Sequence, residues 1–531
     1  MHHEAELIRF LLTDPAAAPN EQIHGGPDAV VHETHTSIVV ATGQHAYKLK
    51  RSIRLPYLDF STPKLREQVC QRELELNRRT APDLYLAAPR ITRGPQGHLA
   101  LDGPGSHEDT VVLMRRFAGS DVLDSLARHG RLTPALMTPL ARLLAAFHAS
   151  AKVSDDAEGA ARVLAILDLN AQSEAGTAEI LGNPQALKLG RTLRDQWTRH
   201  AKLLDERARA GKVRLCHGDL HLGNICVWEG KAVPFDCLEF DETLATTDVL
   251  YDLAFLLMDL WRYDECRLAN LVMNRYMDET GDIDGLPLLP FFIALRAAIR
   301  AQVLATQANI TDDTLHADRC RHQANQFLAL AFDVLTPRPT RLIAIGGLSG
   351  TGKSSLAINL AHAVGPVPGA RVLSSDRIRK QLAGVPAEHP LPPHSYTPEA
   401  SRRVYQEQAQ RSTRVLKNGY AVIADAVFSK PEERATIQAC ATREGVPFTG
   451  LWLDASQDTL MHRVQARVND PSDATIDVVR RQLQYDTGVL DWTLISAENT
   501  PEGVAHEAHA VLQQARLRQC TPPGDRQQDS R

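Results

Sequence analysis

The sequence feature that most constrains the fold is the glycine-rich stretch GGLSGTGKSS at residues 346–355. An apolar run, Leu342 to Ile345, precedes it and a helical pattern follows, so the stretch joins a strand to a helix. Four of its residues fit the spacing GxxxxGK[ST]: Gly347, Gly352, Lys353 and Ser354. In that context glycines allow backbone N–H groups to converge on a phosphate at the helix N-terminus. The motif predicts an α/β unit with a parallel sheet.

The same loop predicts ATP as a ligand. Lys353 is expected to reach the β- and γ-phosphates, and the hydroxyl of Ser354 is expected to bind Mg²⁺. The other residues expected to contact the nucleotide lie beside them: Gly347, Ser349, Gly350, Thr351, Gly352 and Ser355.

Two prolines mark a boundary ahead of this unit. At 531 residues the chain is too long for one core, so two or more domains are expected. Pro337 and Pro339 disfavour helix at the point where a helical pattern gives way to a new strand. The sequence predicts four parts: a first domain at 1–335, a linker at 336–340, a P-loop domain at 341–517 and a disordered tail at 518–531.

Composition narrows the functional classes. A net charge of −5 argues against general nucleic-acid binding, which leaves a basic footprint. Eight single cysteines without a CxxC pair favour reduced thiols in the cytoplasm. The N-terminus lacks the basic start and apolar run of a signal peptide, and the apolar stretches are shorter than the ~20 residues of a membrane span. We expect a cytoplasmic protein without a membrane, nucleic-acid or obligate protein partner.

A second polar site is predicted in the stretch CHGDLHLGNICVWEGKAVPFD. The apolar runs Ile225 to Trp228 and Ala232 to Phe235 flank a three-residue connection that contains Gly230, which is a hairpin signal. Folding this hairpin brings its two ends together, so Asn224 and Asp236 become neighbours.

The oxygen atoms gathered in this way suit Mg²⁺ that carries phosphates. The carboxylate of Asp219, on the loop that leads into the first strand, can take a proton from an attacking hydroxyl. Such a site fits phosphoryl transfer, in which positioning and charge neutralisation do most of the catalysis. The alternative is a buried polar hairpin held by hydrogen bonds alone.

The string HGDLHLGN followed by FD resembles the catalytic loop and metal-binding Asp of aminoglycoside phosphotransferase-like and choline-kinase-like small-molecule kinases. The resemblance implies a protein-kinase-like α+β fold for the first domain. It also implies that Asp219 is the catalytic base, that Asn224 and Asp236 hold Mg²⁺, and that His217 braces the loop.

A kinase-like fold also needs a strand Lys that pairs with a helix Glu and holds the nucleotide phosphates. In AYKLKR, alternation places Lys48 and Lys50 on the same face, and the resemblance favours Lys48. Glu73 lies in the apolar stripe of a predicted helix, where a carboxylate needs a cation; the alternative is an ordinary surface acid. No GxGxxG precedes Lys48, so Thr36 and Ser37 are candidates for phosphate contact.

The segment after the hairpin favours a small-molecule acceptor. Asp248 and the helical run YDLAFLLMDL follow Asp236 within about a dozen residues, which leaves no room for the activation segment of a protein kinase. Gly218 stands where protein kinases carry Arg. Asp252, at the start of the helical run, is expected to be a structural brace.

In the P-loop domain, the strand ARVLSSD ends at Asp376, with Arg379 one helical turn further on. This element resembles the SSD-x-x-R element of P-loop kinases such as polynucleotide kinases, gluconate kinases and the zeta-toxin group, which implies that Asp376 is a base and that Arg379 steadies the acceptor or a phosphate. The alternative is an Asp that only caps its helix. The strand YAVIAD ends at Asp425, which resembles a Walker-B residue that orients Mg²⁺ through water.

Arg463 and Arg467 are four residues apart, and we expect them on one helix face, where they resemble the lid arginines of the same kinases. The alternative is a pair of solvated surface arginines.

The order of the two units resembles bifunctional aminoglycoside phosphotransferase-like/P-loop kinase (ATP-binding) fusion proteins. The leading hypothesis is that each unit transfers the γ-phosphoryl group of ATP to a hydroxyl of a small molecule, with ATP and Mg²⁺ as cofactors. Two alternatives are a small-molecule kinase regulated by a nucleotide-sensing P-loop domain, and a nucleotide-dependent binding module.

Overall fold

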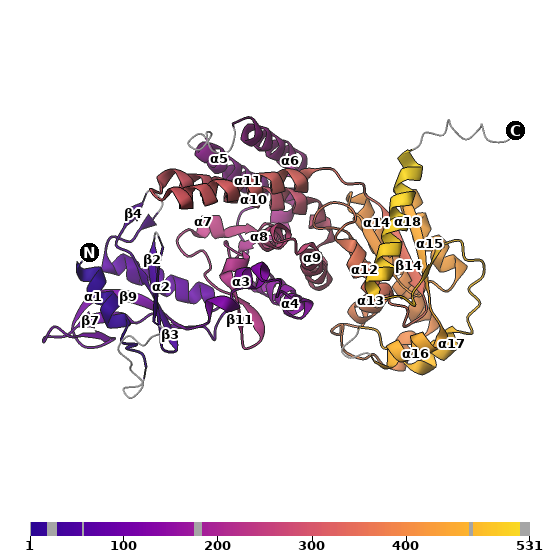
Figure 1. The fold of residues 1–531 in the computed structure, drawn as a ribbon, viewed down its shortest axis with the longest axis horizontal. Helices are drawn as coiled ribbons and strands as arrows, with labels where there is room; N and C mark the ends of the chain where they lie inside the picture. Colours follow the sequence, from indigo (N-terminus) through magenta and orange to yellow (C-terminus); the bar gives the residue numbers. More distant parts are fainter. Residues whose placement is uncertain are drawn as a thin grey trace. The chain divides into compact units, whose positions relative to one another are not determined.

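The computed structural model describes residues 2–17, 29–34, 36–55, 58–174, 183–466 and 471–520 (Figure 1). The chain forms two compact units. The first comprises Met1–Ile166 and Trp197–Tyr263, and the second comprises Leu167–Gln196 and Asp264–Arg531.

The first unit begins with an antiparallel sheet in the order β1-β2-β3-β9-β7-β8, with β6 paired to β9. These strands and their flanking elements are α1 (His2–Leu11), β1 (Val30–Glu33), β2 (Ser37–Thr42), β3 (His45–Lys50), β4 (Arg54–Leu55), β5 (Leu58–Asp59), α2 (Pro63–Asn77), β6 (Tyr85–Ala87), β7 (Arg90–Arg93), β8 (Leu99–Leu101) and β9 (Ser106–Arg115). Alternation along β3 turns Tyr47 and Leu49 toward α1 and turns Ala46 toward α2. Helix α2 starts where the Thr62 hydroxyl accepts a hydrogen bond from the backbone N–H of Leu65.

A mostly helical region completes the first unit. Its elements are η1 (Gly119–Asp121), α3 (Leu123–Arg128), α4 (Pro134–Ser150), α5 (Gly159–Glu174), α6 (Asn183–Arg209), β10 (Val213–Leu215), η2 (Leu222–Asn224), β11 (Ile225–Trp228), β12 (Lys231–Pro234), α7 (Glu242–Ala245), β13 (Thr246–Asp248) and α8 (Val249–Arg262), with α5 and α6 continuing into the second unit. The predicted hairpin is present as β11 and β12. Its turn has two residues rather than the predicted three, because Lys231 pairs with Trp228; Glu229 and Gly230 have φ of 49° and 77°.

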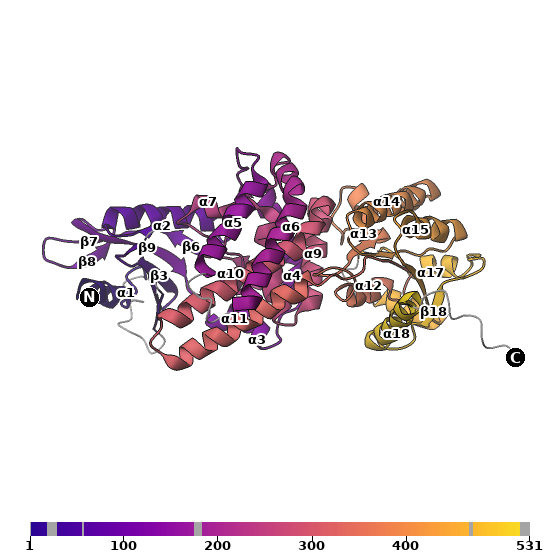
Figure 2. The same cartoon turned by 90° about the horizontal axis from the view of Figure 1, so that it is seen from above.

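The second unit contains a parallel sheet in the order β15-β16-β14-β17-β18. Its elements are α9 (Cys266–Thr280), η3 (Ile283–Leu288), α10 (Leu289–Ile310), α11 (Thr314–Leu335), β14 (Leu342–Gly347), α12 (Lys353–Ala361), β15 (Arg371–Ser374), α13 (Ser375–Leu382), η4 (Pro393–Tyr396), α14 (Pro398–Lys417), β16 (Val422–Asp425), α15 (Pro431–Arg443), β17 (Phe448–Asp454), α16 (Gln457–Gln465), α17 (Ile476–Gln482), β18 (Thr493–Ser496) and α18 (Pro501–Cys520). Figure 2 shows α12 and α18 on one face of this sheet and α14 and α15 on the other.

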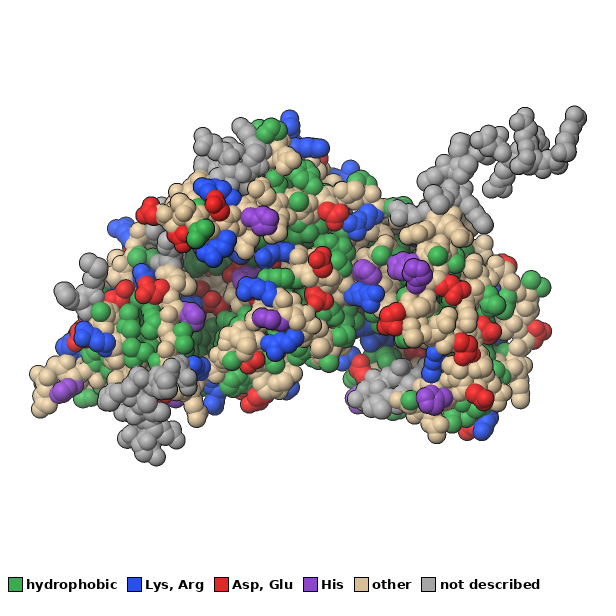
Figure 3. Space-filling model, viewed as in Figure 1, with side chains coloured by type: hydrophobic (Ala, Val, Ile, Leu, Met, Phe, Trp, Pro, Cys, Tyr) green, Lys and Arg blue, Asp and Glu red, His purple; other side chains and the backbone are tan. Residues whose placement is uncertain are grey.

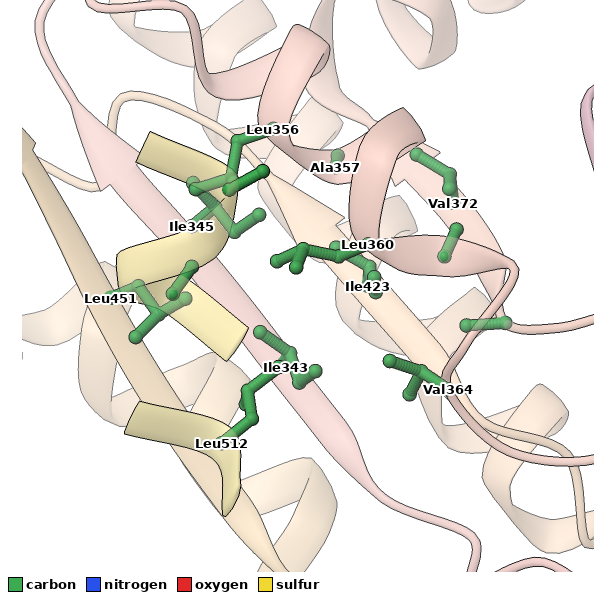
Figure 4. Close-up of a cluster of buried hydrophobic side chains, with 14 of the residues drawn as sticks. Ile343, Ile345, Leu356, Ala357, Leu360, Val364, Val372, Ile423, Leu451 and Leu512 are labelled. Atoms are coloured by element: carbon green, nitrogen blue, oxygen red, sulfur yellow. The ribbon is translucent and has the colours of Figure 1, made fainter. Parts of the chain in front are cut away.

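The core of the second unit lies between β14 and helices α12 and α18. Ile343 and Ile345 point from the central strand toward Leu356 and Leu360 of α12, as Figure 4 shows. All four side chains are buried, as expected of a parallel strand covered on both faces. This packing sets the angle at which α12 leaves the glycine-rich loop.

The predicted fold class is confirmed in both units, including the parallel sheet. Helix α11 ends at Leu335 and β14 begins at Leu342, so residues 336–341 connect them. Residues 264–335, however, fall in the same compact unit as the parallel sheet. The domain boundary at 336–340 therefore stays a prediction. Helix α18 runs to Cys520, and residues 521–531 of the predicted tail lie outside the described residues.

One segment of the described residues, Ile283–Ile310, is long and apolar enough to cross a membrane, but 78% of its most apolar window is buried inside the protein. Helix α10 makes up most of it, and a core helix has the same length and composition. Side chains of both signs are interspersed on the face drawn in Figure 3, so that face presents no broad basic surface.

Candidate active sites

In the first unit, strand β3 carries Lys48 and Lys50 on the face turned to α2, as alternation predicts. The Lys48 Nζ atom lies 2.8 Å from Glu73 Oε1 and 2.5 Å from Asp236 Oδ1. Glu73 is 0% exposed, so it is not an ordinary surface acid. One ammonium group thus ties together the sheet, helix α2 and the end of the hairpin.

Lys50 makes a second set of ion pairs, one with the same helix and one with the segment after the hairpin. Its Nζ atom lies 2.6 Å from Glu73 Oε2 and 2.5 Å from Glu239 Oε1. The two lysines thus share Glu73 and differ in their second partner, since Lys48 pairs with Asp236. Glu239 had no prediction attached to it, although a carboxylate in the mostly apolar stretch FDCLEF was a usable signal.

The charges of this cluster support one another. Burial opposes the positive charge of Lys48, but the carboxylates of Asp236 and Glu73 hold its pKa well above the ordinary value. Burial likewise opposes ionisation of Glu73, and the two lysines overcome it and lower its pKa. Burial raises the pKa of Glu239, and the charge of Glu73 adds to that shift. Both lysines and Glu73 are therefore held in their charged forms, and the charge of Lys50 opposes the upward shift of the Glu239 pKa.

The loop before the hairpin holds Asp219 against Asn224. The Asn224 amide donates to Asp219 Oδ2 at 2.9 Å and to its carbonyl oxygen at 3.0 Å. The backbone N–H of Phe235 donates to the carbonyl of Asn224 at 2.9 Å, so the two ends of the hairpin meet as predicted. The Asp219 side chain is 41% exposed and is open to solvent.

Asp252 braces the loop before the hairpin through hydrogen bonds, as predicted. It accepts hydrogen bonds from the backbone N–H groups of His217 and Gly218 and lies 3.1 Å from His148 Nε2. Gly218 has φ of +83°, and a Cβ there would lie 2.8 Å from the Leu238 side chain, so Arg is excluded at this position. His217 is buried and its Nε2 atom lies 3.0 Å from the Phe235 carbonyl.

A cavity of about 550 Å³ opens on the face of the sheet that carries Lys48. It is lined by strand and hairpin residues and by the segment that follows β9: Val30, His32, Ala41, Gly43, Gln44, Arg115, Arg116, Phe117, Ala118, Gly119 and Trp228. Ala41, Phe117 and Trp228 also pack in the apolar cluster beneath that face. Its size and its aromatic lining suit a planar ring.

The candidate phosphate residues Thr36 and Ser37 lie at the start of β2. Ser37 is buried, and its backbone N–H donates to the Thr34 hydroxyl at 3.0 Å. The carbonyl of Thr36 accepts from the backbone N–H of Arg51 at 2.8 Å. These bonds close the strand pair, and phosphate contact by either residue stays a prediction.

In the second unit, the glycine-rich loop connects β14 to α12 as predicted. Gly347 and Gly350 have φ of 136° and 96°, and Gly352 caps the helix with φ of 88°. A Cβ on Gly347 would lie 2.5 Å from the carbonyl oxygen of Leu453. Only glycine fits this bend, which turns the loop around the start of α12.

The glycine-rich loop is held by hydrogen bonds within itself and by one to α17. Lys353 Nζ and Thr351 Oγ1 both donate to the carbonyl of Leu348 at 2.8 Å. The backbone N–H of Ser349 donates to Gln482 Oε1 at 2.8 Å. Ser354 and Ser355 follow Lys353 in the first turn of α12. Gln482 had no sequence signal, because only the folded chain brings α17 to the loop.

Asp425 is the last residue of β16. The neighbouring strand β15 ends at Ser374 rather than at the predicted Asp376, which lies in the first turn of α13. The cap position of α13 is held by Ser374, so the alternative of Asp376 as a helix cap is wrong. Asp425 pairs in register with Ser374 and is 2% exposed. Burial raises the pKa of Asp425 to about 6, the charge of Lys353 opposes the shift, and the charge of Asp376 adds to it.

Gln408, on α14, fastens these two strand ends together. Its Nε2 atom donates to the carbonyl of Leu373 at 2.7 Å and to the carbonyl of Asp425 at 3.0 Å. Gln408 is 1% exposed. It had no sequence signal, since a single Gln on a predicted helix is ordinarily solvated.

The predicted arginines differ in their placement. Arg379 donates to the carbonyl of Ser395 at 2.7 Å and lies over the ring of Tyr396, so it binds the segment around η4 rather than the glycine-rich loop. Arg463 lies on α16, as predicted. That helix ends at Gln465, and Arg467 lies outside the described residues, so the predicted pair of arginines stays a prediction.

Comparison with known proteins also divides the chain into two parts. The phosphotransferase enzyme family matches residues 42–280, and the AAA domain family matches residues 342–487. An uncharacterised protein of Mycobacterium tuberculosis is 31% identical over 473 residues, which cover 86% of this chain and 91% of the relative. The adenylyl-sulfate kinase of Myxococcus xanthus is 27% identical over 167 residues, which cover 31% of this chain and 80% of that kinase.

A solved structure, a choline/ethanolamine kinase family protein from Mesorhizobium loti, is 15% identical and covers 62% of this chain and 99% of its own, with a TM-score of 0.35. On the length and identity of the mycobacterial match, the chain belongs to the family of that relative, and it joins a phosphotransferase domain to a P-loop kinase-like domain.

Proposed function

We propose that the first unit transfers the γ-phosphoryl group of ATP to a hydroxyl of a small molecule. The observation that carries the proposal is Lys48, which pairs with both Glu73 and Asp236 beside the Asp219–Asn224 loop. This joins a phosphate-binding cation, hard oxygen ligands and a solvent-open carboxylate in one place.

In this proposal each residue of the first site has a role that follows from its chemistry. Lys48 holds the nucleotide phosphates, and Glu73 keeps Lys48 charged and aligned. The amide of Asn224 and the carboxylate of Asp236 fit Mg²⁺, which neutralises phosphate charge when bound. Asp219 accepts the proton of the acceptor hydroxyl, and its exposure leaves room for that acceptor.

The cavity of about 550 Å³ is proposed to take the adenine ring. Ala41, Phe117 and Trp228 provide apolar and aromatic contact for a flat base. The ring would then lie on the same sheet face as Lys48.

The second unit is proposed to bind MgATP at the glycine-rich loop and to transfer its γ-phosphoryl group to a second hydroxyl acceptor. In this proposal Lys353 and Ser354 bind the phosphates and Mg²⁺, and Asp425 orients the ion through water. Asp376 is the base, and Arg379, Arg463 and Arg467 steady the acceptor or the transferred group. We further propose that the chain works in the cytoplasm on small molecules, without a nucleic-acid, membrane or obligate protein partner.

One observation favours a different role for the second unit. Arg379 is engaged by Ser395 and Tyr396 and is not directed at the loop. A unit that binds ATP without transfer, and so reports nucleotide level to the first unit, would need no free arginine there.

Labelled ATP with a metabolite extract tests both units. With Asp219→Asn one set of labelled products should disappear, and with Asp376→Asn another, while both variants still bind MgADP in calorimetry. Asp83→Asn, an exposed residue of the first unit, serves as the control and should change nothing. Absence of any labelled small molecule with the unmodified chain contradicts the proposal. If Asp376→Asn keeps every product and changes only the response to nucleotide level, the second unit is a sensor.

A further inference from the structure

Helix α9 lies along β15, the edge strand of the parallel sheet in the second unit. The outer edge of such a strand carries backbone N–H and C=O groups that no neighbouring strand binds. Asn270, Asn274 and Asp278 are spaced four residues apart on α9, so they lie on one helix face. All three are directed at β15 and the segment before it.

The two asparagines take the place of a neighbouring strand. Asn274 Oδ1 accepts from the backbone N–H of Val372 at 2.8 Å, and its Nδ2 donates to the carbonyl of Ala370 at 3.1 Å. Asn270 Nδ2 donates to the carbonyls of Pro368 and Ala370, both at 3.1 Å. Side-chain amides can do this because they carry a donor and an acceptor, as a peptide group does.

Asp278 sits at the centre of a buried charge cluster. Arg371, at the start of β15, is 2% exposed, and its Nη2 atom donates to Asp278 Oδ1 at 2.5 Å. Arg275 donates to Asp278 Oδ2 at 2.5 Å, and Arg377 Nη1 lies 3.5 Å from the same oxygen. Burial opposes ionisation of Asp278, and the arginines overcome it and lower its pKa.

The same residue anchors α13. Arg377 and Gln381 lie four residues apart on that helix, and Gln381 Nε2 donates to the backbone carbonyl of Asp278 at 2.8 Å. Asp376 is the residue directly before Arg377. The side chain of Asp278 therefore holds the first turn of α13 through Arg377, and its main-chain carbonyl holds the last turn through Gln381.

We propose that Asp278 is a positioning residue of the second site, which fixes α13 and through it Asp376. The proposal rests on the proposed role of Asp376 as the base. Helix α9 lies within residues 42–280, the region that matches the phosphotransferase family. In this proposal a helix that precedes the predicted linker, α9, helps to position the candidate base of the P-loop unit.

Hydrogen exchange on the full chain tests this without knowledge of the acceptor. With Asp278→Ala, amide exchange across Ser375–Leu382 should rise by about tenfold or more, because Arg377 of that helix loses the carboxylate with which it pairs. MgADP binding at Lys353 should persist. Transfer by the second unit should lose kcat with little change in the KM for ATP. Asp284→Asn, which breaks an exposed pair with Arg414 in the same unit, is the control.

A double variant keeps the test decisive if Asp278→Ala fails to fold. Arg377→Met with Gln381→Met cuts both links from α13 and leaves the Arg371–Asp278 pair intact. Arg411→Met controls for the contact that Gln381 also makes with Arg411. Unchanged exchange across α13 in the folded double variant overturns the proposal. Raised exchange in a chain that transfers nothing supports the anchor and counts against the proposed transfer instead.

Discussion

The two candidate phosphate sites are assembled in opposite ways. In the first unit, Lys48 meets Glu73 across 25 residues of chain and Asp236 across 188. In the second unit, residues 347–355 form the loop without interruption. A continuous loop depends on local glycine geometry, whereas a dispersed site exists only after a sheet, a helix and a hairpin have packed together. Changes to the buried residues of the dispersed site should therefore cost stability, and changes within the loop should mainly cost binding.

The largest expected effect is a loss of kcat in the first unit, caused by a change at Asp219, the solvent-exposed carboxylate of the dispersed site. Asp219→Asn should lower the kcat of the first unit by about 10³-fold, because the proton acceptor is lost while the hydrogen bond with Asn224 can be kept. The free energy of unfolding should change by less than about 0.5 kcal/mol, since the side chain is exposed. Steady-state kinetics and urea titration measure the two quantities. A large loss of stability together with an unchanged kcat would mean that the residue serves only the fold.

Glu73→Gln, by contrast, should mainly lower the free energy of unfolding. The change leaves Lys48 and Lys50 with one fewer carboxylate inside the protein, and breaking a buried ion pair costs about 3 kcal/mol. Urea unfolding, followed by hydrogen exchange in α2, measures the loss. Glu75→Gln on the same helix removes an exposed pair with Arg72 and should cost less than about 0.5 kcal/mol. Equal effects of the two variants would contradict the proposed importance of the buried cluster.

The same contrast explains what the sequence could predict. The glycine-rich loop, the hairpin and the face shared by Lys48 and Lys50 follow from local spacing and alternation, and all three are present. The pairing of Lys48 with Glu73 was predictable because an acid in an apolar stripe needs a cation.

The remaining features depend on tertiary packing that local patterns do not encode. Gln408 and Gln482 reach strand ends and loop amides only after their helices dock. The end of α16 at Gln465 also escaped prediction, because nothing in the run HRVQARV marks a helix stop there. The contact of α9 with the edge of β15 could not be predicted for the same reason. Asn274 and Val372, which are bonded to each other, lie 98 positions apart in the chain.

In the second unit, Asp425→Asn should raise stability in a pH-dependent way. The pKa of Asp425 rises from 3.8 to about 6 on folding, so the folded state holds the proton more tightly. That stabilisation is complete below pH 3.8 and is lost as the pH rises through about 6. The variant should therefore be more stable than the natural chain by about 2 kcal/mol above pH 7, and the difference should shrink toward pH 5.

Urea titrations between pH 5 and pH 8 provide the measurement. Asp454→Asn, an exposed residue at the end of another strand of the same sheet, should show no such dependence. A constant difference across the range would mean that Asp425 is already ionised without cost in the folded chain.

A substitution within the continuous loop separates strain from binding. Gly352→Ala should cost about 1 kcal/mol, because φ of 88° is left-handed while open space surrounds the new Cβ. Gly384→Ala provides a matched control, since Gly384 has φ of 69°, also meets no atom within 4 Å, and lies outside the loop. Both variants should lose similar stability in urea. Only Gly352→Ala should weaken MgADP binding to the second unit in calorimetry, because its strain reorients the N–H groups at the start of α12. Equal binding by the two variants would mean that the loop tolerates local strain. That result would contradict the expectation that changes within the continuous loop mainly cost nucleotide binding.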